Sequence, residues 1–357
     1  MSADQRATTA VAAPPLVDQV RSALAEAYYR PVPANVLRIE NVRRMISALD
    51  DPYTAYLRPA TYRLVRQETA STYTGIGASV LPSRHHFVVV SLLAGPAQAA
   101  GIRVGDTIVR IGGESTAHMS MTHATARILG PAGTRVHLEL MRGQRRLDLN
   151  VPRAVIHSPP VHARLVSYVG HRYGVVAITS FSVGTSVLVR QELQKLSQEG
   201  ADGLVLDLRE DPGGLVAQAV NVTSLFINRG VVVSLQGLHQ PQQVLHANPG
   251  SVTKLPLVVL VDRYTASAAE IVAAALRDNH RATVVGERTF GKALVQAVDP
   301  LTNGAALELS IAHYTTPSGQ DLSGVGLTPQ IPARDDPRTG QDEALATALR
   351  VLARPAS

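Results

Sequence analysis

The chain has no cysteine among its 357 residues, which excludes thiolate catalysis, cysteine-based zinc sites and disulfide bonds. That absence is compatible with an oxidising compartment but does not prove one. No run approaches the roughly 18 apolar residues of a membrane-spanning helix, so the sequence predicts a soluble chain. The first residues, MSADQRATTAVAAPP, lack the charged-then-apolar pattern of an export signal. The protein either stays inside the cell or has lost an export segment.

Aromatic residues are also scarce, at 4%, and the basic residues are rarely interleaved with them. A net charge of +6 and a pI near 9.8 would suit a nucleic-acid partner. However, the densest basic cluster, RGQRR at 142–146, lies between two strand-like runs, as a hairpin turn would. We therefore interpret the positive charge as solvated surface and expect no nucleic-acid partner. The hydrophobic fraction of 45% indicates a globular protein, long enough for two or three domains.

The beginning of the chain predicts helices. Residues 1–15 are small and polar and indicate a loose terminus. Apolar residues then recur at helical spacing over 16–29 and 35–49, which predicts two amphipathic helices. Their apolar faces need cover, either from a second copy of the chain or from the rest of the same chain, and the pattern leaves both open.

Two further blocks follow. Residues 72–155 hold short strand-like runs with Gly and Pro punctuation and one helical stretch near 122–129, which predicts a small, mostly β domain. After a Pro-containing boundary near 157–160, strands and helices alternate to a closing helix at 343–353. This alternation predicts an α/β core over 156–357.

The most informative residues follow two strand-like runs of that core. The runs are PLVVLVD at 256–262 and TVVG at 283–286, and the residues between them that begin at Ser267 have helical character. Strand, helix and strand at this length predict a parallel β-α-β unit, whose following loops open at one edge of the sheet. Ser267 and Lys292 could therefore meet, and a Ser activated by a neutral Lys is a known nucleophile pair. Ser267 and Glu270 also fit a helix capping box, a purely structural alternative.

To act as a base, Lys292 must lose its charge near pH 7. Its pKa must then fall by roughly three units from about 10.4, which burial without a carboxylate partner achieves. The neighbours of Lys292 are apolar, and the nearest acid in sequence, Glu287, is five residues away. Gln296 falls on the same face as Lys292 and could orient its amine.

A second motif overlaps Lys292. Residues 286–292 spell G-x-x-x-x-G-K, the opening of a phosphate-binding loop. The next residue is Ala293 where that loop needs Ser or Thr, and the following LVQAV suggests a strand where it needs a helix. The sequence therefore disfavours a nucleotide-binding function.

A Gly-Gly turn follows the strand-like run at 204–208. Its glycines, Gly213 and Gly214, allow backbone N–H groups to point into a site where a Cβ would clash. Together with the amide of Ala268, they could form an oxyanion hole. The alternative is that the turn only links a strand to a helix.

With these residues in view, the chain resembles the carboxy-terminal processing proteases, a family of Ser-Lys peptidases with an embedded PDZ domain. The resemblance runs in order through seven blocks: LDDPYTAY at 49–56, YTGIGASV at 73–80, GPAQAAGIRVGDTIVRIGG at 95–113, DLREDPGG at 207–214, TASAAEI at 265–271, GERTFGKALVQ at 286–296 and YTTPSGQDLSGVGLTP at 314–329.

The resemblance implies roles for particular residues. Carried over position by position, Ser267 is the nucleophile, Lys292 the general base and Gln296 the support of that Lys. The oxyanion amides fall on Ala268, Gly213 and Gly214, and no metal or other cofactor is needed. The family pattern differs at Asp211, where Asn is common, and at Ala293, where Gly often follows the Lys.

The resemblance also implies how substrates are selected. Gly75, Ile76 and Gly77 match the loop of a PDZ domain that holds a free C-terminal carboxylate while the peptide adds as a strand. Expected substrates are therefore proteins with apolar C-termini, and the PDZ domain could gate the active site.

The resulting expectation is a multidomain α+β and α/β protein. It has a flexible terminus (1–15), an N-terminal helical segment for dimerisation (16–71), an inserted PDZ domain (72–155) and a protease core (156–357) with layers like those of crotonase and Clp protease. A homodimer or higher homo-oligomer in the bacterial periplasm or cell envelope is implied by the family alone. The alternative function is a catalytically inactive, peptide-binding scaffold.

Overall fold

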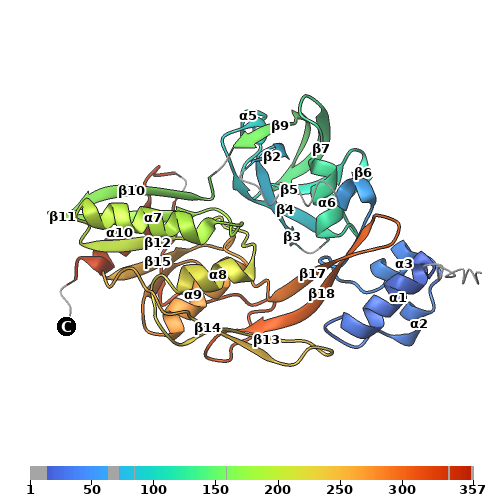
Figure 1. Ribbon diagram of the computed structural model, residues 1–357. Coiled ribbons are helices and arrows are strands. Elements are labelled where there is room, and N and C mark those ends of the chain that lie inside the picture. The colour runs from blue at the N-terminus through green and yellow to red at the C-terminus, as the bar shows by residue number, and fades with distance from the viewer. Residues whose placement is uncertain (1–13, 63–71, 84, 158, 337, 355–357) are drawn as a thin grey trace, which may run out of the picture.

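The computed structural model describes residues 14–62, 72–83, 85–157, 159–336 and 338–354. We refer to three parts: the N-terminal segment (14–62), the β-domain (72–157) and the core (159–354). Figure 1 shows the β-domain above a long two-stranded arm that runs from the core to the N-terminal helices. The loose terminus expected over 1–15 lies outside the described residues up to position 13.

The core is built on a sheet of six strands in the order β10-β11-β12-β15-β16-β19. The β10–β11 pair is antiparallel, and every pair from β11 to β19 is parallel. The strands are β10 (Val161–Tyr168), β11 (His171–Ile178), β12 (Gly203–Asp207), β15 (Leu257–Val261), β16 (Thr283–Gly286) and β19 (Ile331–Pro332). The carboxyl ends of β12, β15 and β16 therefore open at one edge, as the predicted β-α-β unit requires.

Helices cover both faces of this sheet. On one face lie α7 (Thr185–Gln198), α8 (Val216–Thr223) and α9 (Ala268–Asp278), and on the other lies α10 (Glu343–Leu352). Strands β12 and β15 are buried along their whole length, which explains their unbroken apolar sequence. Helix α8 is short, because the Gly-Gly turn precedes it and hydrogen-bonded turns follow it.

The β-domain has its own apolar core. Its sheet has the order β3-β4-β5-β7-β8, with β6 paired to β5, and β2 pairs with β9 where the chain enters and leaves. The elements are β2 (Thr72–Gly75), β3 (Ala78–Ser83), β4 (His86–Leu92), α5 (Pro96–Ala99), β5 (Thr107–Ile111), β6 (Glu114–Ser115), α6 (Met121–Ile128), β7 (Arg135–Arg142), β8 (Arg145–Pro152) and β9 (Ala154–His157). The hairpin predicted at the basic cluster is confirmed, since Arg142 faces Arg145 across its turn.

The N-terminal segment consists of α1 (Leu16–Ala27), α2 (Ala34–Leu37), α3 (Val42–Ser47) and β1 (Ala55–Leu57). The single helix expected over 35–49 is therefore wrong: the chain forms two short helices there. The break arises because α2 ends at Arg38 and Asn41 caps a new helix, with its side chain accepting the Arg44 N–H at 3.1 Å.

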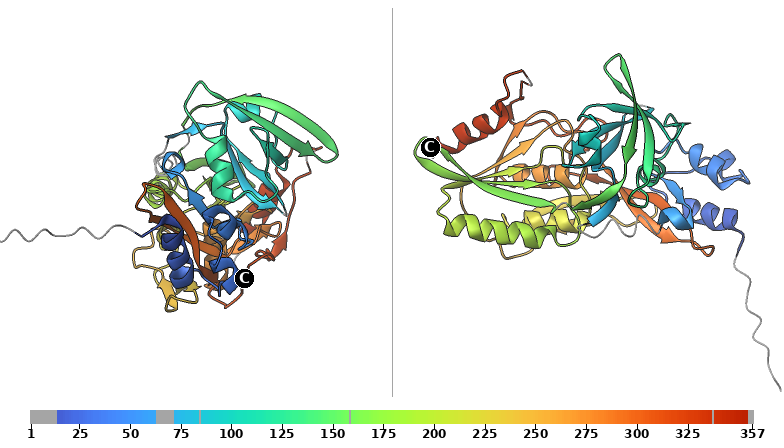
Figure 2. Two further views of the ribbon diagram at one scale, coloured as in Figure 1. Left: turned by 90° about the vertical axis from the view of Figure 1, so that its right-hand side faces the viewer. Right: turned by 90° about the horizontal axis from the view of Figure 1, so that it is seen from above.

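A long arm connects the core to the N-terminal helices (Figure 2). It is formed by β17 (Leu294–Pro300) and β18 (Ala306–Thr315), and β18 also pairs with β1 and with the hairpin of β13 (Val231–Gln236) and β14 (Gln243–His246). The apolar faces of α1 to α3 pack against this arm, around Leu307 and Leu309. Their burial thus needs no second chain. Over the described ranges, no helix has both the length and the apolar character to cross a bilayer.

Candidate active site

Ser267 lies where the loop after β15 enters α9. Its φ of +55° is unusual for a residue with a Cβ, and such strain, of the order of 1–3 kcal/mol, is concentrated at functional sites. The side chain is largely buried, and the position at the helix N-terminus places it near free backbone donors.

Lys292 lies in the loop between β16 and β17, and its backbone is tied to that of Ser267 by one carboxylate. The Oε2 atom of Glu270 accepts the N–H of Ser267 at 2.8 Å and the N–H of Lys292 at 3.0 Å. The Oε1 atom accepts the Thr289 hydroxyl at 2.5 Å and the Gly291 N–H at 2.8 Å. Burial raises the pKa of Glu270 to about 7, while these four donors favour its ionised form.

Tyr314, on β18, binds the backbone carbonyl groups of the same two residues. Its hydroxyl lies 2.8 Å from the carbonyl oxygen of Lys292 and 3.1 Å from that of Ser267, so its single proton is shared between them. The ring is fully buried. Glu270 and Tyr314 together form a backbone clamp, and the two residues that sequence patterns predicted to converge are held side by side.

The side chains of Ser267 and Lys292 are not hydrogen-bonded to each other. Among the hydrogen bonds of the described residues, none joins the Ser267 hydroxyl to the Lys292 amine. The Nζ atom of Lys292 instead lies 4.6 Å from the ring centroid of Tyr53, in the N-terminal segment. Burial lowers the pKa of Lys292, while the nearby carboxylates of Glu308, Asp51 and Glu270 oppose that shift.

Lys292 lines a cavity of about 610 Å³. Its walls come from three parts of the chain, with Tyr53 from the N-terminal segment, Pro82 and Ser83 from β3, and Phe290 from the loop that carries Lys292. Lys292 is thus reached from a chamber between the β-domain and the core.

Gln296 lies on β17, where the sequence pattern suggested that it would orient Lys292. Its amide donates to the Ser310 hydroxyl at 3.5 Å, across the β17–β18 pair. A hydrogen bond to Lys292 is not among those of the described residues. Strand β17, which contains Gln296, begins at Leu294 and so continues directly from the loop that carries Lys292.

The Gly213-Gly214 turn lies against Ser267. A Cβ on Gly213 would come within 2.8 Å of both Ser267 Cβ and Ala268 N, so only glycine allows this approach. The Gly213 N–H already donates to Asp211 Oδ1 at 2.8 Å. The amides of Gly214 and Ala268 have no acceptor among the described residues, and these two are the donors that could face an oxyanion.

The β-domain packs directly against this site. Leu81 of β3 and Val90 of β4 form an apolar cluster with Ala266 and Phe290, which flank Ser267 and Lys292 in sequence. The Thr122 hydroxyl of α6 also donates to Glu308, the carboxylate that acts most strongly on Lys292. The β-domain therefore contacts the surroundings of both Ser267 and Lys292.

The loop expected to hold a peptide carboxylate, Gly75 to Gly77, connects β2 to β3. Gly77 has a φ of +78°, and the Ile76 side chain is buried in the β-domain core. Strand β3 is the edge of its sheet in the described β-domain, so its outer side is open to an added strand. This arrangement suits strand addition of a peptide C-terminus.

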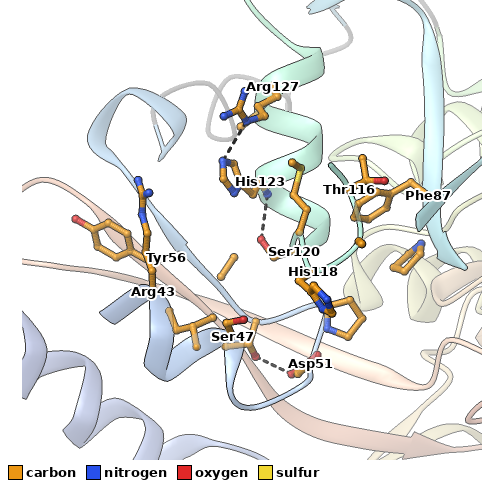
Figure 3. A pocket seen from close by; sticks show the side chains of 18 of the residues that line it. Arg43, Ser47, Asp51, Tyr56, Phe87, Thr116, His118, Ser120, His123 and Arg127 are labelled. Atoms are coloured by element: carbon orange, nitrogen blue, oxygen red, sulfur yellow. Dashed lines mark hydrogen bonds between the residues drawn. The ribbon is translucent and has the colours of Figure 1, made fainter. Parts of the chain in front are cut away.

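A second cavity, of about 490 Å³, lies between the N-terminal segment and the β-domain (Figure 3). Arg43 and Tyr56 face it from one side, and His123 and Arg127 of α6 face it from the other. Neither Ser267 nor Lys292 lines it. Across the described ranges, no group of three or more His, Asp or Glu side chains could hold a metal ion.

Sequence reasoning missed most of the residues that surround the Lys292 amine. Tyr53, Asp51, Glu308 and Tyr314 come from distant parts of the chain, and none was singled out as a site residue. The one available signal was that Asp51, Tyr53 and Tyr314 lie within blocks that carry the family resemblance.

Comparisons with known proteins identify two parts of the chain. Residues 172–333 match the model of peptidase family S41, and residues 88–142 match a PDZ domain. The chain is 36% identical over 294 residues to a carboxyl-terminal-processing protease of Synechocystis sp., covering 81% of this chain and 69% of that protein. It is 34% identical over 309 residues to the carboxy-terminal processing protease CtpA of Bacillus subtilis, covering 86% and 66%.

A solved structure extends the likeness to nearly the whole chain. The photosystem II D1 C-terminal processing protease has a TM-score of 0.79 and 31% identity, with coverage of 96% of this chain and 97% of that one. The chain belongs to peptidase family S41 and is a carboxyl-terminal processing serine protease with a PDZ domain.

Proposed function

We propose that the chain is a Ser-Lys endopeptidase that cleaves proteins near their C-termini and is gated by its PDZ domain. The observation that carries this proposal is the backbone clamp, in which Glu270 and Tyr314 each bind both Ser267 and Lys292. Such a clamp holds the two backbones at a fixed separation, which is what two side chains need in order to react as a pair.

In the proposed reaction, neutral Lys292 takes the proton of the Ser267 hydroxyl as Oγ attacks the carbonyl carbon of the scissile peptide bond. The amides of Ala268 and Gly214 stabilise the negative oxygen of the tetrahedral intermediate. The Lys292 ammonium then protonates the leaving amine, and the acyl-enzyme forms. Water releases the acyl group, with Lys292 again acting as base. We assign the role of Gln296 to support of the strand that follows Lys292.

The absent Ser267–Lys292 hydrogen bond fits a resting state. With Lys292 placed over Tyr53 and near Glu308, its amine is drawn away from the nucleophile. The contact of Leu81 and Val90 with Ala266 and Phe290 would hold that state. Binding of a substrate tail to the PDZ domain would shift this contact and let the pair form.

A prediction tests the gate. Leu81→Ala removes buried apolar contact between the PDZ domain and the core, of the order of 2–5 kcal/mol for a buried Leu. We expect cleavage of a short peptide that lacks a PDZ-binding tail to rise by about threefold or more, because the resting state loses stability. The matched control is Leu147→Ala, which loosens the PDZ core on β8, away from the interface. A fall in cleavage by the Leu81 variant alone would mean that the contact activates the enzyme.

A second prediction concerns the substrate tail. An unfolded protein ending in apolar residues with a free carboxylate should be cleaved about 10- to 100-fold more efficiently, as kcat/KM, than the same chain with an amidated C-terminus. The reason is that the loop at Gly75–Gly77 and the open edge of β3 offer sites for a carboxylate and an added strand. A tail ending in Asp serves as a further comparison. Equal kcat/KM for all three chains would remove tail recognition from the proposal.

Further parts of the proposal concern organisation. We assign 16–71, of which 63–71 lie outside the described residues, to an N-terminal helical segment that takes part in dimerisation. We assign 72–155 to the PDZ domain and 156–357 to a protease core with layers like those of crotonase and Clp protease. We propose a homodimer or higher homo-oligomer in the bacterial periplasm or cell envelope. These assignments rest on the family resemblance, and two relatives, from Tetradesmus obliquus and Arabidopsis thaliana, are named as chloroplastic.

A further inference from the structure

Asp211, in the turn between β12 and α8, is a fully buried carboxyl group that the proposed reaction does not use. Its Oδ1 accepts the Gly213 N–H at 2.8 Å, and its backbone carbonyl accepts the Ala266 N–H at 2.9 Å. Its Oδ2 has no hydrogen-bond partner, a condition shared among the described buried side chains only by Thr223 Oγ1. A buried polar atom without a partner in a native protein calls for an explanation.

The turn that Asp211 organises is the one that touches the nucleophile. Gly213, held by Asp211, has a φ of +96°, and its Cα faces Ser267 Cβ and Ala268 N at a distance that leaves no room for a Cβ. Asp211 therefore acts on both sides of the oxyanion site, through Ala266 on the loop before Ser267 and through Gly213 on the turn opposite it.

The surroundings disfavour a negative charge on Asp211. Asp262, on the loop after β15, is the charged group that acts on it, and it has the same sign. The nearest cation in the turn that contains Asp211 is Arg209, and its guanidinium already forms ion pairs with three other carboxylates: Asp207, Asp335 and Asp342. Glu210, in the same turn, is a further acid. Burial raises the pKa of Asp211 well above its ordinary value, and Asp262 adds to that shift while the Gly213 hydrogen bond opposes it.

We propose that Asp211 is a positioning residue that holds the Gly213-Gly214 turn as a neutral carboxylic acid, and that its ionisation places a buried negative charge beside the oxyanion site and so disables that site. The inference rests on the proposed Ser-Lys mechanism and deepens it. Burying a neutral acid that accepts the Gly213 N–H costs far less desolvation free energy than burying a carboxylate whose second oxygen has no hydrogen-bond partner. It also places no negative charge beside the oxyanion that forms during attack.

The test is the pH profile of kcat/KM on one unfolded substrate. The wild-type profile should be bell-shaped, rising as Lys292 and Glu270 lose protons and falling as Asp211 ionises. Asp211→Asn, an uncharged isostere, should lose the falling limb. Asp211→Ala leaves the Gly213 N–H without an acceptor and should be at least tenfold less active than Asp211→Asn at every pH. The matched control is Glu210→Gln, which removes the neighbouring acid, whose pKa burial raises to about 7, and should keep the falling limb.

A second readout does not depend on activity. Because the native pKa of Asp211 lies above the unfolded value of about 3.9, the native state holds its proton more tightly, and stability falls as pH rises between these two values. Thermal unfolding should therefore show the Tm of Asp211→Asn rising relative to wild type across that window. A pH-independent Tm difference, a wild-type profile without a falling limb, or a falling limb retained in Asp211→Asn would each overturn the proposal. Failure of the Ser-Lys mechanism would appear separately, as activity that survives in Ser267→Ala.

Discussion

Ser267→Ala and Lys292→Ala should each lower kcat/KM for protein cleavage by about 10⁴-fold or more, because either change removes one half of a unit that acts together. Lys292→Arg should be as inactive as Lys292→Ala. A guanidinium does not lose its proton at any usable pH, so it cannot take the proton of Ser267. The measurement is cleavage of an unfolded protein with an apolar C-terminus, followed over time and at several enzyme concentrations.

The chain offers a well-matched control for the base. It has three lysines, and Lys195 and Lys254 are exposed, whereas Lys292 is partly buried. Lys195→Ala should therefore keep wild-type kcat/KM. The double variant Ser267→Ala with Lys292→Ala should be no less active than either single variant, since residues that act as a unit are not additive. Turnover by Lys292→Ala near the wild-type rate would rule out Lys292 as the base.

Glu270 should be the next most sensitive residue, although it touches no reacting atom. Glu270→Ala leaves three buried N–H groups and one hydroxyl without their acceptor, and we expect kcat to fall by about 10³-fold. In Glu270→Gln the amide can donate to Thr289, but the Gly291 N–H then faces a donor. One unsatisfied N–H corresponds to roughly 1–3 kcal/mol, and therefore to about a 10- to 100-fold loss.

The pH dependence of the wild type gives Glu270 a distinct signature. Its pKa of about 7 lies above the unfolded value near 4.5, so the clamp is complete only when the pH rises through about 7. Activity should increase over that range, and Glu270→Gln should lose this part of the rise while it keeps the part due to Lys292. The matched control is Glu199→Gln, at the exposed end of α7. Wild-type kcat and an unchanged profile in Glu270→Gln would show that the clamp does not position the reacting pair.

The sequence supported the core of this site well because local patterns determine it. Uniformly apolar runs and the helix between them predicted that the loops of Ser267 and Lys292 open at one sheet edge, and the shared Glu270 oxygen shows their backbones together. The capping-box interpretation of Glu270 was also sound, because its carboxylate does accept the Ser267 N–H. That local signal could not reveal that the same carboxylate reaches the loop of Lys292 as well.

The parts that the sequence could not predict depend on contacts between distant segments. Tyr53 lies over the Lys292 amine because the arm carries the core strands to the N-terminal segment, and no periodicity encodes that meeting. The Gly213 N–H was expected to face an oxyanion, but the buried Asp211 takes it. Between α2 and α3 a local signal was overlooked instead. Apolar spacing alone predicts one continuous helix there, but Asn41 caps a new helix and so separates the two.

The pairing of β1 with β18 also bears on how the enzyme is made. Ala55 pairs with Glu308, so β1 finds this partner only after the β-domain and most strands of the core have been synthesised. Tyr53 and Asp51, which surround the Lys292 amine, are carried beside this late pairing. Such a long-range closure is slow to form and comes late in folding. A chain that ends before β18 therefore lacks the pairing that carries Tyr53 and Asp51 to the Lys292 amine, and with it part of the surroundings that set the pKa of Lys292.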